Sequence, residues 1–312
     1  MSDDTLPPMD FIVIGAIKAA TTWLQAQLDQ HPDISIPEIE PHYFTREHSR
    51  GAAWYRSLFP DTKAAGSLWG EKTADYLAKP EAAERIAKAY PDVKLIAQLR
   101  NPVDRAYADY KMLFRRGTVT GPPEQYLTWL DNEQPRFLND GLYAAHLRRW
   151  MRLFPPENLL VITFDDVRDH PQRTLTSVLE HLGARPYDDP EAIARRYNDS
   201  SEKLLPMPVR KALAPLKPLA RPYRDNALFR ATRGLFAKPI SYPPLSSDLR
   251  EHLAEFYSQD VRELESMLGR DLSHWVPATS QTPPSALALQ VDEHAQALSN
   301  CMHTGGNDEK IT

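Results

Sequence analysis

The sequence predicts an α/β fold in which helices cover both faces of a central, mainly parallel sheet, with a helical elaboration toward the C-terminus. Three short apolar runs, at 11–14, 93–99 and 159–164, have the length and composition of buried strands. Apolar residues at helical spacing follow each run, and strands that alternate with helices favour parallel pairing. With 312 residues, the chain can bury a large core as one domain.

The first strand leads into a loop that is suited to holding an anion. The run at 11–14 ends at Gly15, and a helix is expected over 20–29. The first amides of a helix have no partner within the helix, and the helix dipole adds partial positive charge there. Lys18 adds a full positive charge to this loop. The alternative is a buried strand leading into a helix, with Lys18 as an ordinary surface lysine.

The residues after Lys18 depart from the usual nucleotide-triphosphatase pattern. Ala19 and Ala20 separate the lysine from Thr21 and Thr22, whose hydroxyls can donate on the first helical turn. In the triphosphatase loop, four residues separate two glycines, and Lys with Ser or Thr follows at once. The loop is therefore only P-loop-like, and the predicted architecture is a P-loop-like three-layer α/β fold.

The chain after the first helix is expected to return to this loop. A turn at 31–33 and an extended stretch at 34–37 follow the helix. A helix of about ten residues travels about 15 Å, and five or six extended residues cover a similar distance. We therefore expect 38–44, which contains Glu40 and His42, to lie beside the loop.

A second strand ends in an arrangement that repeats the first. After short helices at 52–59 and 81–89, the apolar run at 93–99 continues directly into Arg100. Pro102 suits the first turn of the next helix, where its missing N–H costs nothing. Two neighbouring parallel strands that end in this way would place two anion sites along one edge of the sheet. The alternative is a structural Arg100 that is paired with a carboxylate.

The C-terminal half adds helices and a basic segment. Helices are expected over 141–154, 171–182 and 246–268, around the third strand at 159–164. Residues 203–240 are rich in prolines and cations and are expected to form a basic helical excursion. This excursion could instead clamp an anionic cofactor or acceptor.

These patterns divide the chain into one domain and two tails. We expect a flexible N-terminus over 1–9, a domain over 10–277 and a disordered tail over 278–312. The cations between 203 and 238 are a local exception in a chain whose net charge is -5. Contact with a membrane surface through 203–238 is the less favoured role for them.

Composition argues against several classes of function. A net charge of -5 and a pI near 6.1 disfavour a nucleic-acid partner. The single cysteine, Cys301, allows neither an internal disulfide nor a multi-thiolate metal site, and no metal is expected. We expect no secretory signal and no membrane span, because the first residues are acidic and no apolar run is long enough. These features indicate the cytoplasm.

Two phosphate-binding loops and a returning carboxylate together predict group transfer from a nucleotide. A kinase normally places an acidic residue at a strand end, whereas the second strand here ends in Arg100. Sulfuryl transfer fits better, because the moving group carries less charge than a phosphoryl group and can be handled by Lys and amides. A P-loop nucleotide kinase and a non-catalytic nucleotide-binding module are the alternatives.

Four segments, in order and spacing, carry a resemblance to a known family. They are GAIKAATT at 15–22, EIEPHYF at 38–44, GEKT at 70–73, and the stretch 99–110 that begins LRNP. Across 10–275 the chain resembles the sulfotransferases that use 3′-phosphoadenosine-5′-phosphosulfate (PAPS), in the branch of the heparan sulfate N- and 3-O-sulfotransferases and their bacterial relatives. The resemblance implies sulfuryl transfer to a hydroxyl or amine of a small-molecule or glycan acceptor, which leaves 3′,5′-adenosine bisphosphate.

The resemblance implies that the first loop holds the 5′-phosphosulfate. The residues concerned are Lys18, Ala19, Ala20, Thr21 and Thr22. Lys18 would also offset the charge that develops on the leaving phosphate.

The resemblance further implies roles for side chains outside that loop. Glu40 would be the general base that removes the acceptor's proton during in-line attack on sulfur. His42 and Lys72 would line the same centre, Arg100 would hold the 3′-phosphate, and Lys238 would lie over the cofactor. The alternatives are a solvated carboxylate for Glu40, and a structural ion pair or packed ring for Lys72 and His42.

The sequence departs from the family pattern at three places. Ala20 stands where the family often has Gly, which narrows the loop without removing its amides. Ala108 stands where the family usually has Ser, so a hydroxyl to the 3′-phosphate is lost. Lys238 is followed by Pro239 and Ile240, where the eukaryotic relatives have Lys-Gly-Arg, and Ile240 cannot replace the arginine. Neither the acceptor nor the oligomeric state follows from the sequence.

Overall fold

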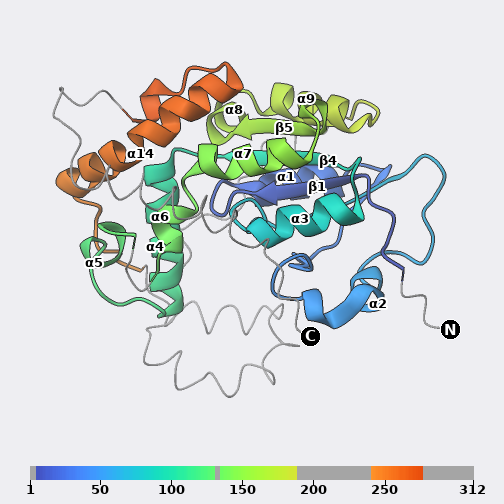
Figure 1. Cartoon of the computed structure of the whole chain (residues 1–312), viewed down its shortest axis with the longest axis horizontal. Helices are drawn as coiled ribbons and strands as arrows, with labels where there is room; N and C mark the ends of the chain where they lie inside the picture. Colours follow the sequence, from blue (N-terminus) through green and yellow to red (C-terminus); the bar gives the residue numbers. More distant parts are fainter. Residues whose placement is uncertain (1–4, 131–133, 188–239, 277–312) are drawn as a thin grey trace, which may run out of the picture.

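The computed structural model describes residues 5–130, 134–187 and 240–276, which form a sheet with helices on both faces (Figure 1). Five strands lie in the order β2-β3-β1-β4-β5, and each neighbouring pair is parallel. The strands are β1 (Phe11–Gly15), β2 (Ile34–Ser35), β3 (Leu68–Lys72), β4 (Lys94–Leu99) and β5 (Leu159–Thr163). The prediction of a mainly parallel sheet is therefore confirmed.

Helices connect the strands and extend the fold beyond β5. They are α1 (Thr21–Asp29), α2 (Gly51–Arg56), α3 (Pro80–Ala89), α4 (Pro102–Arg116), α5 (Glu124–Leu127), α6 (Arg136–Asn139), α7 (Tyr143–Leu153), α8 (Phe164–Asp169), α9 (Pro171–Leu182) and α14 (Ser247–Leu268). Single turns of 3₁₀ helix lie at His48–Arg50, Pro156–Asn158 and Ser273–Trp275.

Alternate strand residues face two different buried clusters. Phe11 and Val13 of β1, with Ile96 of β4, pack on the face that α1, α8 and α9 cover. Ile12 and Ile14 point the other way and join α3, α4, α7 and α14. Figure 1 shows α3 and α7 in front of the strands. The two clusters make this a three-layer α/β fold, as predicted.

Helix α14 supplies the expected helical elaboration within the described residues. Ser246 caps its start, because Ser246 Oγ accepts from the Leu249 amide (3.3 Å), and Gly269 follows its end with a φ of 60°. The helix packs against α7 and α4. A Cβ at Gly141, just before α7, would lie 2.8 Å from the ring of Tyr257, so this close approach requires glycine.

The last described residues return to the end of β4. Asn101 caps α4 by accepting from the Val103 amide (2.9 Å), and its Nδ2 donates to the Trp275 carbonyl (2.9 Å). Tyr143 Oη donates to the carbonyl of Arg100 (2.9 Å). The backbone around Arg100 is therefore fixed from α7 and from the C-terminal side of the domain.

Strand β3 and the short helices α5, α6 and α8 were not among the predicted elements. Strand β3 carries Gly70 and two charged residues, and a Cβ at Gly70 would lie 2.2 Å from the Phe11 ring. The third strand ends at Thr163 because Thr163 and Asp166 form a capping box, with hydrogen bonds of 3.1 and 2.8 Å, that starts α8. Helix α2 also ends at Arg56 rather than at 59.

Several expectations fall outside the described residues. They are the basic excursion at 203–240, with Lys238, and the tail at 278–312. The N-terminal segment is described from Thr5 onward, and the Pro7 carbonyl accepts a hydrogen bond from Tyr90 Oη (2.8 Å). Within the described ranges, no helix is both long enough and apolar enough to cross a membrane.

Candidate active site

The loop between β1 and α1 offers backbone amides to an anion. Lys18 and Ala20 adopt left-handed backbone conformations, with φ of 67° and 68°. Left-handed residues in a loop make successive N–H groups converge on one concavity. No side chain caps α1 at Ala20, and the Trp23 amide donates to the Ala20 carbonyl (2.9 Å), so the amides of Thr21 and Thr22 on the first turn are the ones that can turn to an anion. Thr21 is buried and Thr22 is half-buried on the first turn.

The loop is fixed by neighbouring main chain and by one side chain of β4. Gly15 has a φ of 153°, and a Cβ there would lie 2.8 Å from the carbonyl oxygen of Ala74. The Gln98 carbonyl accepts from the Ala16 amide (2.7 Å), and Gln98 Nε2 donates to the Ala19 carbonyl (2.6 Å). Sequence reasoning missed Gln98. The available signal was a polar residue inside an apolar strand.

The ends of β1 and β4 bring Lys18 and Arg100 together. Arg100 Nη1 donates to the Lys18 carbonyl (3.4 Å), and its guanidinium lies over the Phe164 ring, 4.8 Å from the centroid. Lys18 Nζ contacts Met112 Sδ at 3.8 Å. In the part of the chain that the structure describes, neither cation forms an ion pair with a carboxylate. The structure therefore does not support a carboxylate-paired Arg100.

Positive charge is concentrated around Lys18. Burial is the largest cause that lowers the pKa of Lys18, and Asp109 opposes this shift. Arg116 and Arg100 lower the pKa of Lys18 further. Burial, followed by Arg100, also lowers the pKa of Lys111. A lowered pKa means that the protein disfavours the charged ammonium form. A bound anion would stabilise that form of Lys18 and Lys111.

Glu40 reaches the same edge of the sheet, as the length of the returning segment predicted. Gln25 of α1 donates from Nε2 to the carbonyls of Pro37 (2.9 Å) and Glu38 (3.3 Å). Glu40 then forms an ion pair with Lys72 at the end of β3. The Lys72 side chain is only 3% exposed, so Glu40 compensates a buried ammonium.

His42 lies between two carboxylates. Its φ is 50°, and its amide donates to Thr73 Oγ1 (3.3 Å). Its Nδ1 lies 2.9 Å from Asp75 Oδ1, and its Nε2 lies 3.7 Å from Glu40 Oε2. We call Glu40, His42, Lys72 and Asp75 the carboxylate cluster. Sequence reasoning missed Asp75, although a carboxylate just past a strand end was a usable signal.

A buried carboxyl lies behind the cluster. Glu71 is fully buried, and its carboxyl accepts from the hydroxyls of Tyr55 (2.7 Å), Thr73 (2.8 Å) and Tyr76 (3.2 Å). Burial raises the pKa of Glu71 to about 7, while these hydrogen bonds and His42 act in the opposite direction. The strand thus alternates a buried acid with a lysine that faces the cluster.

The predicted site residues that the structure describes share one edge of the sheet. Strands β3, β1 and β4 are parallel neighbours, so their C-terminal ends meet there. This edge holds the carboxylate cluster, the β1–α1 loop and Arg100, whereas Lys238 lies outside the described residues. Within the described ranges, no group of three or more His, Cys, Asp or Glu side chains is placed to hold a metal ion.

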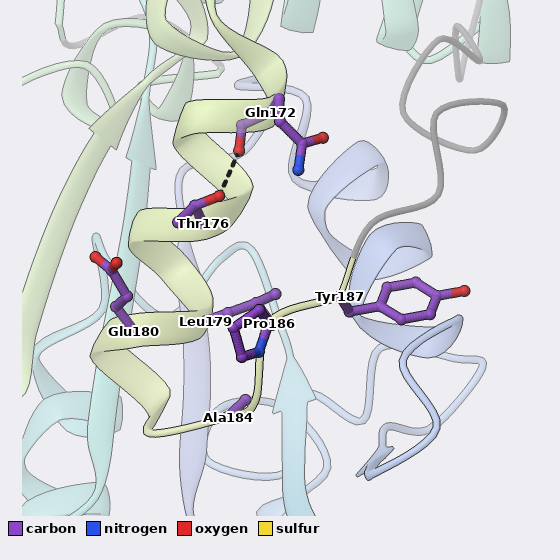
Figure 2. Close-up of a pocket in the computed structure, with 7 residues that line it drawn as sticks. All are labelled: Gln172, Thr176, Leu179, Glu180, Ala184, Pro186 and Tyr187. Carbon is purple, nitrogen blue, oxygen red and sulfur yellow. Dashed lines mark hydrogen bonds between the residues drawn. The ribbon is translucent and has the colours of Figure 1, made fainter.

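A separate pocket of about 310 Å³ lies along α9 (Figure 2). Thr176 hydrogen-bonds within α9 to the Gln172 carbonyl at 3.1 Å. The lining residues are Gln172, Thr176, Leu179, Glu180, Ala184, Pro186 and Tyr187. None of them belongs to the strand edge described above, so this pocket is not the candidate site.

Comparison with known sequences agrees with the geometry of this edge. A family model described as "Sulfotransferase domain" matches residues 8–203. Human heparan sulfate glucosamine 3-O-sulfotransferase 6 is 36% identical over 179 residues, which is 56% of this chain and 52% of the relative. Mouse heparan sulfate glucosamine 3-O-sulfotransferase 3B1 is 30% identical over 267 residues, which is 83% of this chain and 63% of the relative. The chain thus spans about half to two thirds of the length of these relatives.

A bifunctional relative and a solved structure extend the match. Human bifunctional heparan sulfate N-deacetylase/N-sulfotransferase 3 is 31% identical over 303 residues, covering 88% of this chain and 31% of the relative. A crystal structure of a sulfotransferase from Alicyclobacillus acidocaldarius superposes with a TM-score of 0.62 and 26% identity, over 86% of this chain and 99% of that chain. The matched region includes the β1–α1 loop, the carboxylate cluster and Arg100. The chain belongs to the sulfotransferase family.

Proposed function

We propose that this protein transfers a sulfuryl group from PAPS to a hydroxyl or amine of a glycan or small-molecule acceptor. One observation carries the proposal. Lys18 follows β1 and Arg100 follows β4, and neither cation has a carboxylate partner among the described residues. At the same edge, Lys72 at the end of β3 pairs with Glu40, the carboxylate that can act as a base.

The residues fit a nucleotide with anionic groups at both ends. Lys18 and the amides of α1 would bind the 5′-phosphosulfate, and Arg100 would bind the 3′-phosphate. Ala108 lies one turn before Met112, which contacts Lys18, so Ala108 is on the loop side of α4. Lys111, whose pKa is lowered by burial and next by Arg100, would add a second cation on the side of Arg100.

Glu40 acts as the general base in this proposal. Its side chain is 32% exposed, which leaves it open to an acceptor. Lys72 holds one carboxylate oxygen, and the Ala74 amide donates to the other at 3.2 Å, so the group is oriented. A base within hydrogen-bond reach contributes about 10²- to 10⁴-fold to rate. PAPS supplies the sulfuryl group, and Lys18 stabilises the charge that develops on the leaving phosphate.

Incubation with ³⁵S-labelled PAPS and a panel of acceptors tests the proposal. The panel should include desulfated heparan oligosaccharides, amino sugars and small alcohols, because the relatives are named for heparan sulfate. We expect labelled acceptor whose mass has increased by one sulfonate. Lys18→Ala should lower both turnover and bisphosphate affinity, and unchanged turnover would contradict the assignment. Lys94→Ala is the matched control, because Lys94 begins β4 at the opposite edge and binds the Glu157 carbonyl (3.0 Å).

Calorimetry separates the two alternatives from this proposal. Binding of 3′,5′-adenosine bisphosphate without Mg²⁺ is expected of a sulfotransferase. Binding of ATP only with Mg²⁺, and none of the bisphosphate, would instead indicate a kinase. Tight bisphosphate binding with no transfer to any acceptor in the panel would favour a non-catalytic module.

A further inference from the structure

We propose that Asp75 positions His42 as the second proton acceptor of the site, in a relay that begins at Glu40. Asp75 accepts a hydrogen bond from Nδ1–H of His42, and this leaves Nε2 unprotonated, with its lone pair toward Glu40. The relay rests on the proposed function, whereas the pairing of Asp75 with His42 stands on geometry alone.

The contacts of the imidazole carry the proposal. Its Nδ1 lies 2.9 Å from Asp75 Oδ1, and its Nε2 lies 3.7 Å from Glu40 Oε2. In a neutral imidazole one nitrogen donates and the other accepts, and the hydrogen bond at one nitrogen sets the role of the other. Because a carboxylate can only accept, Asp75 fixes the proton on Nδ1. The nitrogen that faces the proposed base is then free to take a proton.

The backbone holds both partners of this hydrogen bond. His42 keeps a φ of 50°, which non-glycine residues seldom adopt, and its carbonyl accepts from the amides of Thr45 (3.2 Å) and Glu47 (3.1 Å). Asp75 lies between two residues, Thr73 and Leu77, whose amides donate to β1 carbonyls at 3.0 and 2.8 Å. The backbone at His42 and around Asp75 is therefore held by hydrogen bonds, so the two side chains can keep a fixed relative position.

The second oxygen of Asp75 is also placed. Asp75 Oδ2 lies 3.4 Å from Thr45 Oγ1, and the side chain is 18% exposed. The charged groups around the ring of His42 are Glu40 and Asp75, with the buried Glu71 behind them and Lys72 bound to Glu40. The relay needs Nε2 unprotonated, and the hydrogen bond from Nδ1 to Asp75 favours the neutral tautomer that meets this need.

The proton balance of the relay closes on these residues. As the acceptor oxygen or nitrogen bonds to sulfur and the sulfur–phosphate oxygen bond breaks, the acceptor proton moves to Glu40 Oε2. It then moves from Glu40 to Nε2 of His42, which leaves an imidazolium between the carboxylates of Asp75 and Glu40. The His42 side chain is 14% exposed, so the imidazolium can return the proton to water. Glu40 is ionised again for the next turnover.

Nitrogen NMR of the full-length protein tests the positioning without requiring activity. The chain has ten histidines, so the signals of His42 in ¹⁵N-histidine-labelled protein are assigned by their loss in His42→Gln. We expect the Nδ1–H tautomer near neutral pH in the wild type. In Asp75→Ala we expect the proton to move to Nε2, where it can donate to Glu40. A wild-type Nε2–H tautomer, a doubly protonated ring, or an unchanged tautomer in Asp75→Ala would overturn the proposal.

Kinetics of the same variant test the relay. Asp75→Ala should lower kcat about tenfold or more, with the KM for PAPS and the bisphosphate affinity within twofold of wild type. Retained bisphosphate binding shows that the variant folds. Asp104→Ala is the matched control, since it removes a surface carboxylate that pairs with Arg250 (3.0 Å). An unchanged kcat in Asp75→Ala would reject the relay. If the wild type transfers no sulfuryl group, the proposed function fails, and the nitrogen spectrum still decides the role of Asp75.

Discussion

The β1–α1 loop and the carboxylate cluster lie at neighbouring strand ends but treat charge in opposite ways. In the loop, Lys18 contacts the thioether of Met112, while Arg100 contacts the Lys18 carbonyl and the Phe164 ring. In the cluster, Lys72 is paired with Glu40, and His42 with Asp75. Net positive charge therefore remains where an anionic nucleotide would bind, whereas each carboxylate has a partner where a proton would move. The difference separates binding from proton transfer. Substitutions in the loop should therefore lower nucleotide affinity, and substitutions in the cluster should lower kcat.

Glu40→Gln should give the largest effect, because it removes the proposed base while leaving the loop intact. We expect kcat to fall about 10²- to 10⁴-fold, with bisphosphate affinity within twofold of wild type. Steady-state kinetics and calorimetry on the same preparation measure both quantities. Glu38→Gln is the control, since Glu38 is exposed two residues earlier. A loss of bisphosphate affinity as large as the loss of kcat would contradict the separation.

Arg100→Ala should show the reverse division. Hydrogen bonds to charged groups are worth about 1.5 to 3 kcal/mol, so bisphosphate affinity should weaken about 10- to 100-fold. At saturating PAPS, kcat should change much less. Arg185→Ala, which removes a surface arginine paired with Asp33, should change neither quantity. Affinity that stays at the wild-type value would show that Arg100 does not bind the 3′-phosphate.

Ala108→Ser should change nucleotide binding alone, because it adds a hydroxyl donor near the proposed 3′-phosphate site and leaves the carboxylate cluster unchanged. Ala108 is half-buried on the side of α4 that carries Met112. One hydrogen bond to the 3′-phosphate should tighten bisphosphate binding about tenfold. Titration calorimetry checks this, with kcat expected to stay at its wild-type value. An affinity that barely changes would contradict the placement of Ala108 beside the 3′-phosphate.

Glu71→Gln should affect neither binding nor proton transfer but should change how stability depends on pH. Because burial raises the pKa of Glu71 from 4.5 to about 7, the folded protein holds a proton there that the unfolded chain has lost. Stability from this group is therefore present below about pH 4.5 and is lost as pH rises toward 7. Across this window, the stability of the variant relative to wild type should rise by up to about 1 kcal/mol per pH unit. Urea unfolding at several pH values measures this difference, and a constant difference would argue against the raised pKa.

The main features of the fold followed from the sequence because they depend on local apolar pattern. The runs at 11–14 and 93–99 form the central strands β1 and β4. Their parallel order places Lys18 and Arg100 on one edge, and the length of the return carries Glu40 to it. Each of these inferences needed only burial, chain length and the rule that parallel strands end together.

The missed features depend on contacts between segments far apart in the chain. Strand β3 is tolerated because three hydroxyls satisfy Glu71 and the Phe11 ring covers Gly70. The polar side chain of Gln98 inside β4 is explained only by its hydrogen bond to the β1–α1 loop. Asp75 gains its partner only when 38–44 has folded back to the end of β3. No periodicity in the sequence reports such partners.

The hydrogen bond from Asn101 to Trp275 gives the domain an order of completion. Asn101, the residue after Arg100, donates to the carbonyl of Trp275, which lies 174 positions later in the chain. A nascent polypeptide can assemble the strands and the lysine-bearing turn early, since domains form as synthesis proceeds. The end of β4 that carries Arg100, the proposed 3′-phosphate ligand, therefore gains this hydrogen bond only after residue 275 has been synthesised.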